Sequence, residues 1–403
     1  MCSVVSRLLL KFFIGSAIIT VLIAFLPGLP PNIQLEPYTV TPSIDLAKLP
    51  RVNALDTAEV ILQGQVHGTE SIVAIGTGDG FYSGQENGQI IKYENGKVSV
   101  IARTGTDCAG PSEGHICGRP LGMRLDSSGN IVVADAYYGI LRVNPKTGKI
   151  VPLFDYKSKI QGRAPLFADD LDISKDGTIY WSDVSTTTDY STQVVEFLSD
   201  KPTGRLIKFD PKTKQNIVLI DGIHFANGVQ LSKDEDFVLI CETIRSRIFR
   251  YYLKGPKAGQ QDIFMDGLPG LPDNIRSNGK GGFYIALIVN RQAFYETIAP
   301  LPIVRKVILR VRSLLLGTVS FIESFVSKNP LIEDMKQYVS KIGPIGNPPK
   351  SLIGPSRILE VDGTGQILRV LEHSKEQIKW ATQMTISENS CAPLLPSCIS
   401  NKC

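Results

Sequence analysis

The sequence of 403 residues lacks the signals of several protein classes. Its four histidines show no metal-ligand spacing, which disfavours a zinc site. Its seven cysteines are too scattered for a dense disulfide framework, although they suit an oxidising compartment. A formal net charge of +4 is small for this length, and no cluster of Lys and Arg interleaves with aromatic residues, so we expect no nucleic-acid partner. No Asn-x-Ser/Thr sequon occurs, so no glycosylation signal supports a topology.

The chain does contain a repeat in which an oxygen-bearing residue precedes an alternating strand pattern. Four copies begin at Glu70, Asp169, Asn227 and Asp273, and a fifth copy places Leu121 at the same position. After a polar turn, each copy leads into a β-rich run; these runs are residues 81–83, 130–134, 178–181, 237–241 and 283–287. Steps of 46 to 58 residues, with strands between them, predict the blades of a β-propeller.

We therefore predict an all-β fold, a six-bladed β-propeller over residues 59–389. A sixth unit begins near Trp380 and does not finish, because residues 390–403 show no strand alternation. The last blade is thus predicted to be incomplete, with exposed strand edges, and residues 390–403 to form an atypical tail.

A change of pattern between residues 291 and 340 predicts a helical insertion in the propeller. Within it, residues 303–326 have apolar side chains at helical spacing with basic residues between them. One interpretation is a lid or a surface that contacts membrane lipid, since basic amphipathic helices bind anionic lipid. The other is that the helices pack on the scaffold.

The N-terminus carries an apolar run over residues 8–26, nearly long enough to cross a bilayer core of roughly 30 Å. Arg7 and Lys11 lie at its start, and no acidic residue occurs before Glu36, so residues 1–7 are predicted to be cytoplasmic. A Pro-rich linker, residues 27–58, follows. We predict a single-pass type II protein of the endoplasmic reticulum or plasma membrane, with the propeller lumenal or extracellular. A cleaved signal peptide is the alternative.

Two cysteines, Cys108 and Cys117, bracket a Gly/Pro-rich loop and form the best candidate disulfide. Cys241 falls in a predicted strand and is expected to be a buried thiol. Residues 110–114 match the G-x-S-x-G nucleophile motif, but they lie in the loop between Cys108 and Cys117 and not at a strand-to-helix elbow. We therefore do not expect a serine nucleophile.

Equivalent positions of a propeller point toward one axis, so the repeated oxygen-bearing residues are expected to converge. The candidate metal ligands are Glu70, Asp169, Asn227, Asp273 and Asn274. Hard oxygen ligands with three carboxylates among them suit Ca²⁺. The competing interpretation is that Asn-Gly and Asp-Asn are turn residues of the blade loops. A bound Ca²⁺ polarises an ester or lactone carbonyl, with a carboxylate or water as the base.

The chain contains four specific motifs, Cys117-Gly118-Arg119-Pro120-Leu121-Gly122, Ala134-Asp135-Ala136-Tyr137, Phe225-Ala226-Asn227-Gly228-Val229-Gln230-Leu231-Ser232 and Pro272-Asp273-Asn274-Ile275-Arg276. Together these motifs resemble blocks of the strictosidine synthase-like family. The similarity runs from about Asp56 to Thr382. The resemblance implies a six-bladed propeller with four-stranded blades, a type II membrane anchor and arylesterase-like activity.

The resemblance extends to the related paraoxonases, whose Ca²⁺ ligands fall on the same five candidate positions, with Asp169 replacing an amide. The paraoxonase catalytic histidine pair falls on Leu121 and Ala136, so the catalytic residues of this chain are not identified. The glutamate that strictosidine synthase uses to condense an amine with an aldehyde lies in the last blade, where the pattern of this chain departs from the family. That condensation is therefore a poorer hypothesis.

Two functions remain open at this stage. The first is a membrane-anchored, Ca²⁺-dependent hydrolase of small aryl or lipophilic esters, which the candidate ligand set favours. The second is a non-catalytic, membrane-anchored binding propeller, which the absence of the histidine pair favours. The expected partners are a small ester substrate and membrane lipid, contacted through residues 8–26 and, in the lipid-binding interpretation, residues 303–326.

Overall fold

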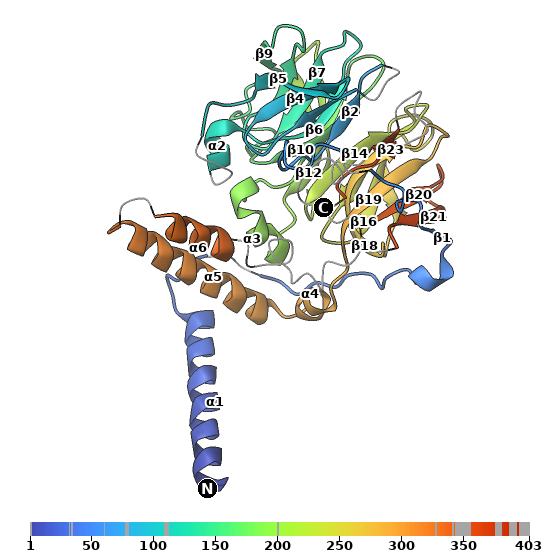
Figure 1. Cartoon of the computed structure of the whole chain (residues 1–403). Helices are drawn as coiled ribbons and strands as arrows, with labels where there is room; N and C mark the ends of the chain where they lie inside the picture. The colour runs from blue at the N-terminus through green and yellow to red at the C-terminus, as the bar shows by residue number, and fades with distance from the viewer. Residues whose placement is uncertain are drawn as a thin grey trace. The chain divides into compact units, whose positions relative to one another are not determined.

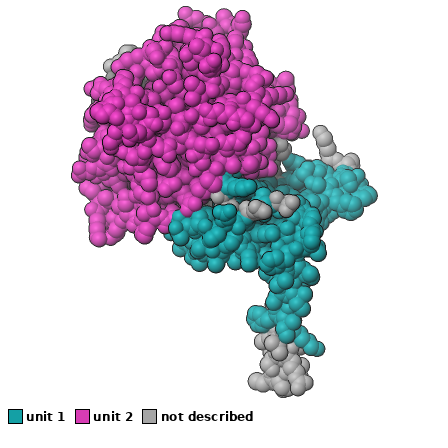
Figure 2. Space-filling view, turned by 180° about the vertical axis from the view of Figure 1, so that it is seen from behind, with its two compact units in different colours: residues 1–39, 194–201, 292–348 teal, residues 40–193, 202–291, 349–403 magenta. Residues whose placement is uncertain are grey.

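The structure is a computed structural model of the chain (Figure 1). It describes residues 2–31, 33, 35–59, 61–76, 80–108, 113–199, 201–326, 329–340, 342, 356–374, 381–386 and 393–394. The chain divides into two compact units, each described here by itself (Figure 2). Unit 1 comprises residues 1–39, 194–201 and 292–348, and unit 2 comprises residues 40–193, 202–291 and 349–403.

Unit 2 consists of β-sheets in which sequence neighbours pair in antiparallel fashion. Four sheets hold four strands each: β2–β5 (Ile72–Ala74, Phe81–Gly84, Gln89–Glu94, Lys97–Arg103), β6–β9 (Pro120–Leu125, Ile131–Asp135, Gly139–Val143, Ile150–Pro152), β10–β13 (Ala168–Ile173, Ile179–Asp183, Gly204–Asp210, Gln215–Ile223) and β14–β17 (Ala226–Leu231, Phe237–Glu242, Arg247–Tyr252, Gln261–Met265). The fifth sheet has the order β1-β21-β20-β19-β18 (Arg51–Val52, Ile367–Glu372, Arg357–Val361, Phe283–Asn290, Gly270–Ser277). A sixth sheet pairs β22 (Thr385–Ile386) with β23 (Pro393–Leu394).

The first strands of successive sheets contact one another, from β2 through β6, β10 and β14 to β18. Strand β22 contacts β2, and the amide of Asn274 donates to the carbonyl of Thr382 at 3.0 Å, which joins β18 to the segment before β22. The first strands therefore form a closed ring, the arrangement of a β-propeller. The predicted sheet architecture is confirmed. In the described residues, the sixth sheet contains only two short strands, and the ring closes through its first strand.

Part of the segment assigned to the linker belongs to the propeller. Strand β1 pairs in parallel with β21, and Leu55 is buried beside Tyr284 and Ile358. The amide of Ile44 also donates to the carbonyl of Gly267 at 2.8 Å. The chain before β2 thus covers the outer edge of the fifth sheet, and this pairing protects an edge strand.

The repeated positions found in the sequence share one backbone feature. The register shifts between Pro120 and Met123 in β6, between Ala168 and Leu171 in β10, between Ala226 and Val229 in β14, and between Pro272 and Ile275 in β18. Each shift is a β-bulge of two residues, and a bulge changes the direction in which a side chain points. The sequence repeat therefore marks a repeated bulge.

The bulges allow the first strands to approach one another closely at two glycines. A Cβ added to Gly122 would lie 2.6 Å from Cα of Asp170, and one added to Gly228 would lie 2.4 Å from the carbonyl oxygen of Asp273. Both distances are far below van der Waals contact, and in both cases the obstacle is backbone. Glycine is therefore required for packing at these two positions.

Replacing Gly228 with alanine is expected to destabilise unit 2 by about 3 kcal/mol, because backbone must move to admit the methyl group. Urea unfolding measures the loss. Gly317→Ala is the control, because no atom lies within 4 Å of its added Cβ and alanine favours the helix that contains it. Equal midpoints for the two variants would contradict the packing role of Gly228.

Unit 1 is helical. It contains α1 (Cys2–Phe25), α4 (Ala293–Ile298), α5 (Pro302–Glu323), α6 (Pro330–Ser340) and most of α3 (Gln193–Leu198). Helices α4 to α6 lie in the stretch for which the sequence predicts helices, and Pro302 occupies the favoured first turn of α5. Leu198, Ile298 and Leu309 form its buried cluster. In the part of the chain that the structure describes, no helix combines the length and the apolar character needed to cross a membrane.

Candidate metal centre

The side chains predicted as metal ligands lie at one end of the first strands of unit 2. Asp169, Asn227 and Asp273 are each the first residue of a bulge, and Glu70 precedes β2 by two residues. All four are at most 7% exposed. These four side chains are called the oxygen ring below. Leu121 holds the equivalent position in β6 and is also buried.

One hydrogen bond connects two members of the ring, and another connects the ring to Asn274. Nδ2 of Asn227 donates to Oδ1 of Asp273 at 2.7 Å, and Nδ2 of Asn274 donates to Oε1 of Glu70. Three other oxygens of the ring, Oε2 of Glu70, Oδ1 of Asn227 and Oδ2 of Asp273, are buried and accept no hydrogen bond from any described residue. A buried oxygen without a partner costs about 1–3 kcal/mol, and a cation bound in the ring would satisfy all three.

Burial and mutual repulsion shift the titration of the ring. Burial, followed by the charge of Asp170, raises the pKa of Glu70 from 4.5 to about 7. Burial and the charges of Glu70 and Asp273 raise the pKa of Asp169 well above its ordinary value. The pKa of Asp273 is likewise raised by burial and by Glu70. Without a cation, the three carboxyl groups therefore favour their protonated forms, and a bound cation would favour the charged forms.

The oxygen ring fits a hard cation in chemistry. In the described part of the chain, no three His, Cys, Asp or Glu side chains stand close enough to hold a metal ion as they are placed. Carboxylate and amide oxygens without partners are nevertheless the donors that Ca²⁺ takes, and its flexible coordination tolerates donors from several strands. The residues present thus fit Ca²⁺ better than zinc.

Asn274 differs from the other predicted ligands. It is the second residue of its bulge, and its Oδ1 accepts from Nη2 of Arg276 at 3.2 Å while its Nδ2 donates to Glu70. Both ends of its amide are therefore used within the protein. In this arrangement Asn274 positions the carboxylate of Glu70.

A charged layer that the sequence analysis missed lies next to the oxygen ring. Arg276 donates to Oδ2 and Oδ1 of Asp170 at 2.7 and 3.1 Å, and the amide of Val229 donates to Oδ2 of Asp170 at 2.8 Å. Arg124 lies 3.5 Å from Asp170 and 3.3 Å from Asp172. A signal was available, because Arg124, Asp172 and Arg276 each stand three residues after a ring position in the repeat.

Arg119, Phe167 and Phe225 each stand two residues before a repeat position, namely Leu121, Asp169 and Asn227. Arg119 is buried, with Nη1 donating to the carbonyl of Gly68 at 2.6 Å and its guanidinium 5.4 Å from the ring centre of Tyr190. The centre of the aromatic ring of Phe167 lies 5.4 Å from that of Tyr190 and 5.8 Å from that of Phe225. Arg119 also lowers the pKa of Glu70 and Asp169 through its charge, which places it beside the oxygen ring.

Buried acids fix the segments that carry these side chains. Asp135 accepts from the amide of Arg119 at 2.9 Å, Asp183 accepts from the amide of Phe167 at 3.4 Å, and Glu242 accepts from the amide of His224 at 2.8 Å. Each acid ends the second strand of the same sheet. The arrangement explains why an acid recurs at these three strand ends. It also assigns His224, whose Nδ1 lies 3.0 Å from Oε1 of Glu242, to this scaffold.

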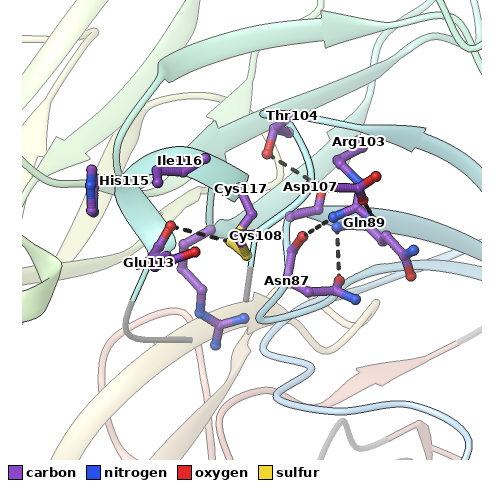
Figure 3. Close-up of a disulfide and its surroundings, with 12 residues drawn as sticks. Asn87, Gln89, Arg103, Thr104, Asp107, Cys108, Glu113, His115, Ile116 and Cys117 are labelled. Carbon is purple, nitrogen blue, oxygen red and sulfur yellow. Dashed lines mark hydrogen bonds and ion pairs between the residues drawn. A yellow bond between two sulfur atoms is a disulfide. The ribbon is translucent and has the colours of Figure 1, made fainter. Parts of the chain in front are cut away.

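The predicted disulfide is present. Cys108 and Cys117 are bonded, with their Cα atoms 5.5 Å apart (Figure 3). The bond ties the segment after β5 to the short helix α2 (Gly114–Cys117), which leads directly to Arg119. Cys241 is a free, buried thiol in β15, as predicted. Ser112 of the G-x-S-x-G match lies outside the described residues, as do Trp380 and most of the predicted tail.

The fold and the ring define a class: a β-propeller whose first strands present buried carboxylate and amide oxygens at one end. Within that class, the chain belongs to the strictosidine synthase-like family of adipocyte plasma membrane-associated proteins. The sequence profile of strictosidine synthase matches residues 169–256, which include Asp169 and Asn227.

The relatives differ in how much of their length is aligned. The adipocyte plasma membrane-associated protein of Bos taurus is 36% identical over 310 residues, 75% of this chain and 75% of that protein. The Gallus gallus protein is 40% identical over 270 residues, 65% of this chain and 64% of that protein. The Drosophila melanogaster protein named Hemomucin is 38% identical over 269 residues, which cover 64% of this chain and 46% of its own length. The alignment thus spans less than two thirds of the chicken and fly proteins.

The solved structures that match this chain have low sequence identity to it. A gluconolactonase from Xanthomonas campestris is 16% identical with a TM-score of 0.45, over 64% of this chain and 84% of that chain. The calcium-binding protein regucalcin from Agrobacterium tumefaciens is 14% identical with a TM-score of 0.41, over 62% and 73%.

Proposed function

We propose that the chain is a Ca²⁺-dependent, esterase-like hydrolase of the arylesterase type, acting on small aryl or lipophilic esters. The observation that carries the proposal is the set of buried oxygens in the ring that accept no hydrogen bond from any described residue. A scaffold that buries three carboxyl groups at such electrostatic cost is expected to hold a cation there. The family to which the chain belongs supports the reaction class.

Glu70, Asp169, Asn227 and Asp273 would hold the cation. When bound, Ca²⁺ supplies a Lewis acid that polarises the ester carbonyl and stabilises its developing negative charge. Asn274 and Arg276 keep Glu70 and the layer beneath it in place. Asp169, a carboxylate at a position where the related paraoxonases have an amide, is the member of the ring best suited to act as a base.

In this scheme a carboxylate oxygen of Asp169 accepts the proton of the attacking water. The same proton then passes to the leaving oxygen, so one water cleaves one ester into an acid and a phenol or alcohol. Burial and the charges of Glu70 and Asp273 raise the pKa of Asp169, whereas a bound cation would favour the charged form that accepts this proton. No histidine is required for the proton transfer, in agreement with Leu121 and Ala136 at the positions of the paraoxonase pair.

The neighbouring side chains suit an aryl group. Phe167, Phe225 and Tyr190 form a chain of edge-to-face contacts, a geometry that also accommodates an aromatic ring of a ligand. The guanidinium of Arg119 is buried, with Nε donating to the hydroxyl of Tyr190 at 3.2 Å and Nη1 to the carbonyl of Gly68 at 2.6 Å. It can donate to a carbonyl oxygen or to a developing oxyanion.

Phenyl acetate hydrolysis by the purified full-length chain tests the proposal. We expect hydrolysis with Ca²⁺ and its loss, by at least about tenfold, after chelation with EGTA, with recovery when Ca²⁺ is restored. Mg²⁺ in place of Ca²⁺ serves as the control, because its rigid octahedral preference suits this ring poorly. Hydrolysis that is insensitive to EGTA would contradict the proposal.

A binding propeller without catalysis is the second candidate function. Leu121 and Ala136, both buried and apolar, replace the histidine pair and leave the acid–base role to the ring itself. Folded protein that binds Ca²⁺ and does not hydrolyse phenyl acetate would establish this alternative. Amine–aldehyde condensation is not proposed, because the Ser-Glu pair that continues the family pattern is not clearly present after Ala381-Thr382 in this chain.

We further propose that residues 8–26 anchor the chain as a single-pass type II membrane protein of the endoplasmic reticulum or plasma membrane, with unit 2 lumenal or extracellular. Among its relatives, several are named plasma membrane-associated proteins. The described side chains of α1 support the proposal, because Phe13, Ile14, Ile18, Ile19, Leu22 and Phe25 are all exposed. Large apolar side chains exposed along a helix favour an apolar environment.

A single substitution tests this topology. Lys97→Thr creates an Asn95-Gly96-Thr sequon in the exposed turn between β4 and β5, in a chain that has no sequon of its own. Expression in microsomes is expected to give a glycosylated product that resists carbonate extraction. Lys97→Ala is the matched control and should remain unglycosylated. An integrated but unglycosylated Lys97→Thr product would reverse the proposed orientation.

A further inference from the structure

Helix α5 uses its arginines to hold the ends of other helices in unit 1. Nη1 of Arg310 donates to the carbonyls of Ile23, Ala24 and Leu26, at 2.8, 3.0 and 3.1 Å, around the C-terminal end of α1. Carbonyls at a helix C-terminus lack partners within the helix and carry partial negative charge, so a guanidinium is a favourable cap. These bonds connect α5 directly to the end of the apolar helix α1.

Two further arginines of α5 act in the same way. Nη1 of Arg305 donates to the carbonyl of Leu198 at the end of α3 at 2.9 Å, and Nη2 of Arg312 donates to the carbonyl of Ser340 at the end of α6 at 2.9 Å. All three arginines are at most 4% exposed. Three of the four positive charges that make α5 look basic in sequence therefore point into unit 1, and the fourth, on Lys306, is half-buried.

The exposed face of α5 is apolar along the whole helix. One row consists of Val304, Val311, Leu315 and Ile322, spaced by seven, four and seven residues, and the adjacent row consists of Ile303, Leu314 and Phe321. These intervals place both rows on the same side of a helix with 3.6 residues per turn. Phe325, just past the helix end, extends the stripe and is 74% exposed.

Helix α6 carries a second apolar row. Leu331, Met335 and Tyr338 are exposed at intervals of four and three residues, so they share one face of the helix. Lys336 of α6 pairs with Glu323 of α5 at 2.6 Å, which neutralises both charges. The exposed sides of the α5–α6 pair thus offer large apolar and aromatic side chains with few free charges.

We propose that the exposed apolar stripe of α5, with the adjoining row of α6, is embedded in the lipid bilayer at the interface where α1 leaves the membrane. The inference rests on the proposed anchoring by residues 8–26 and adds a second, monotopic contact. Arg310 fixes α5 at the end of α1, so an anchored α1 brings the stripe to the membrane surface. Burial of apolar side chains in the acyl region drives this contact.

The chemistry of the stripe also defines the kind of lipid. Because the arginines are buried and engaged with carbonyls, the contact does not need anionic headgroups, in contrast to the basic amphipathic helix expected from the sequence. The contact should form on zwitterionic phosphatidylcholine and persist at high salt, which screens charges but not apolar burial.

Quenching by brominated lipid tests the proposal on the full-length chain in phosphatidylcholine vesicles. Tryptophan is introduced at stripe positions in the variants Leu315→Trp and Phe321→Trp. Ile263→Trp is the matched control, because Ile263 is an equally exposed apolar residue on β17 of unit 2. We expect phosphatidylcholine brominated on its acyl chains to quench the added fluorescence of the two stripe variants, without change at high salt, and to leave the control unquenched.

Vesicle flotation in the same samples separates this proposal from the anchor and from catalysis. If the chain floats with the vesicles and the stripe variants are quenched no more than Ile263→Trp, protein covers the stripe and the proposal is overturned. A chain that does not float refutes both the anchor and the stripe contact. Quenching that needs anionic lipid or disappears at high salt also overturns the proposal. Phenyl acetate hydrolysis is independent of all these readings.

Discussion

Calcium is expected to stabilise the protein strongly at about pH 8 and weakly at about pH 5, because protons and calcium compete for the same oxygens. The pKa of Glu70 is raised from 4.5 to about 7, and those of Asp169 and Asp273 are raised well above their ordinary values, mainly by burial. These groups hold protons in the folded chain that they release in the unfolded chain. The calcium-free protein should therefore lose stability as the pH rises from about 4.5 through 7, by on the order of 3 kcal/mol for Glu70 alone.

Bound calcium removes this penalty, since it favours the charged carboxylates. At a concentration about 100-fold above its dissociation constant, calcium adds about 2.7 kcal/mol, and the apparent affinity rises with pH through the same window. Melting temperatures measured from about pH 5 to 8, with Ca²⁺ and with EGTA, check the prediction. Asp273→Asn is the control and should show a much smaller calcium shift. A calcium shift that does not change with pH would contradict the assignment of the ring.

Asp170→Ala is expected to destabilise unit 2 by about 3–5 kcal/mol. Asp170 is fully buried and accepts two hydrogen bonds from Arg276 and one from the amide of Val229. Its removal leaves the buried guanidinium of Arg276 without its main counter-charge. The first strands β10, β14 and β18 meet at this group, so the loss should reduce the cooperativity of the whole propeller.

Urea unfolding of Asp170→Ala against Glu94→Ala measures the effect. Glu94 forms a pair of similar length with Lys92, at 2.7 Å, but at the surface, where removal of an ion pair costs less than about 1 kcal/mol. Similar unfolding midpoints for the two variants would show that the Asp170 network does not hold the strands together.

The bulges show how much of the candidate site could be predicted from the sequence. The alignment of Glu70, Asp169, Asn227 and Asp273 depends on side-chain type and strand spacing. Asp169, Asn227 and Asp273 indeed share one position, the start of a bulge, while Glu70 lies two residues before β2. Thr382 lies at the corresponding place in the sixth sheet. The hydroxyl of Thr382 donates to the carbonyl of Glu70 at 2.6 Å, and the next residue, Gln383, accepts a hydrogen bond from Ser71. The sequence pattern missed Thr382 because only a two-residue strand follows, too short for an alternating signal.

The directions of long side chains could not be predicted. The spacing of residues 303–326 correctly indicates an amphipathic helix, but periodicity alone cannot distinguish an arginine that faces solvent from one that caps a neighbouring helix. The caps on α1, α3 and α6 depend on contacts between segments far apart in sequence. For the same reason, the sequence could not show that the amide oxygen of Asn274, a predicted metal ligand, accepts a hydrogen bond from Arg276.

Isothermal titration of calcium into the purified full-length chain and into the double variant Asn227→Ala/Asp273→Ala tests the central claim most directly. Both side chains belong to the ring, and each has a buried oxygen that accepts no hydrogen bond from the described residues. We predict one calcium site in the wild-type chain and its loss in the folded double variant, with Glu94→Ala, a change at the surface, leaving it intact. Unchanged calcium binding in the folded double variant would contradict the account.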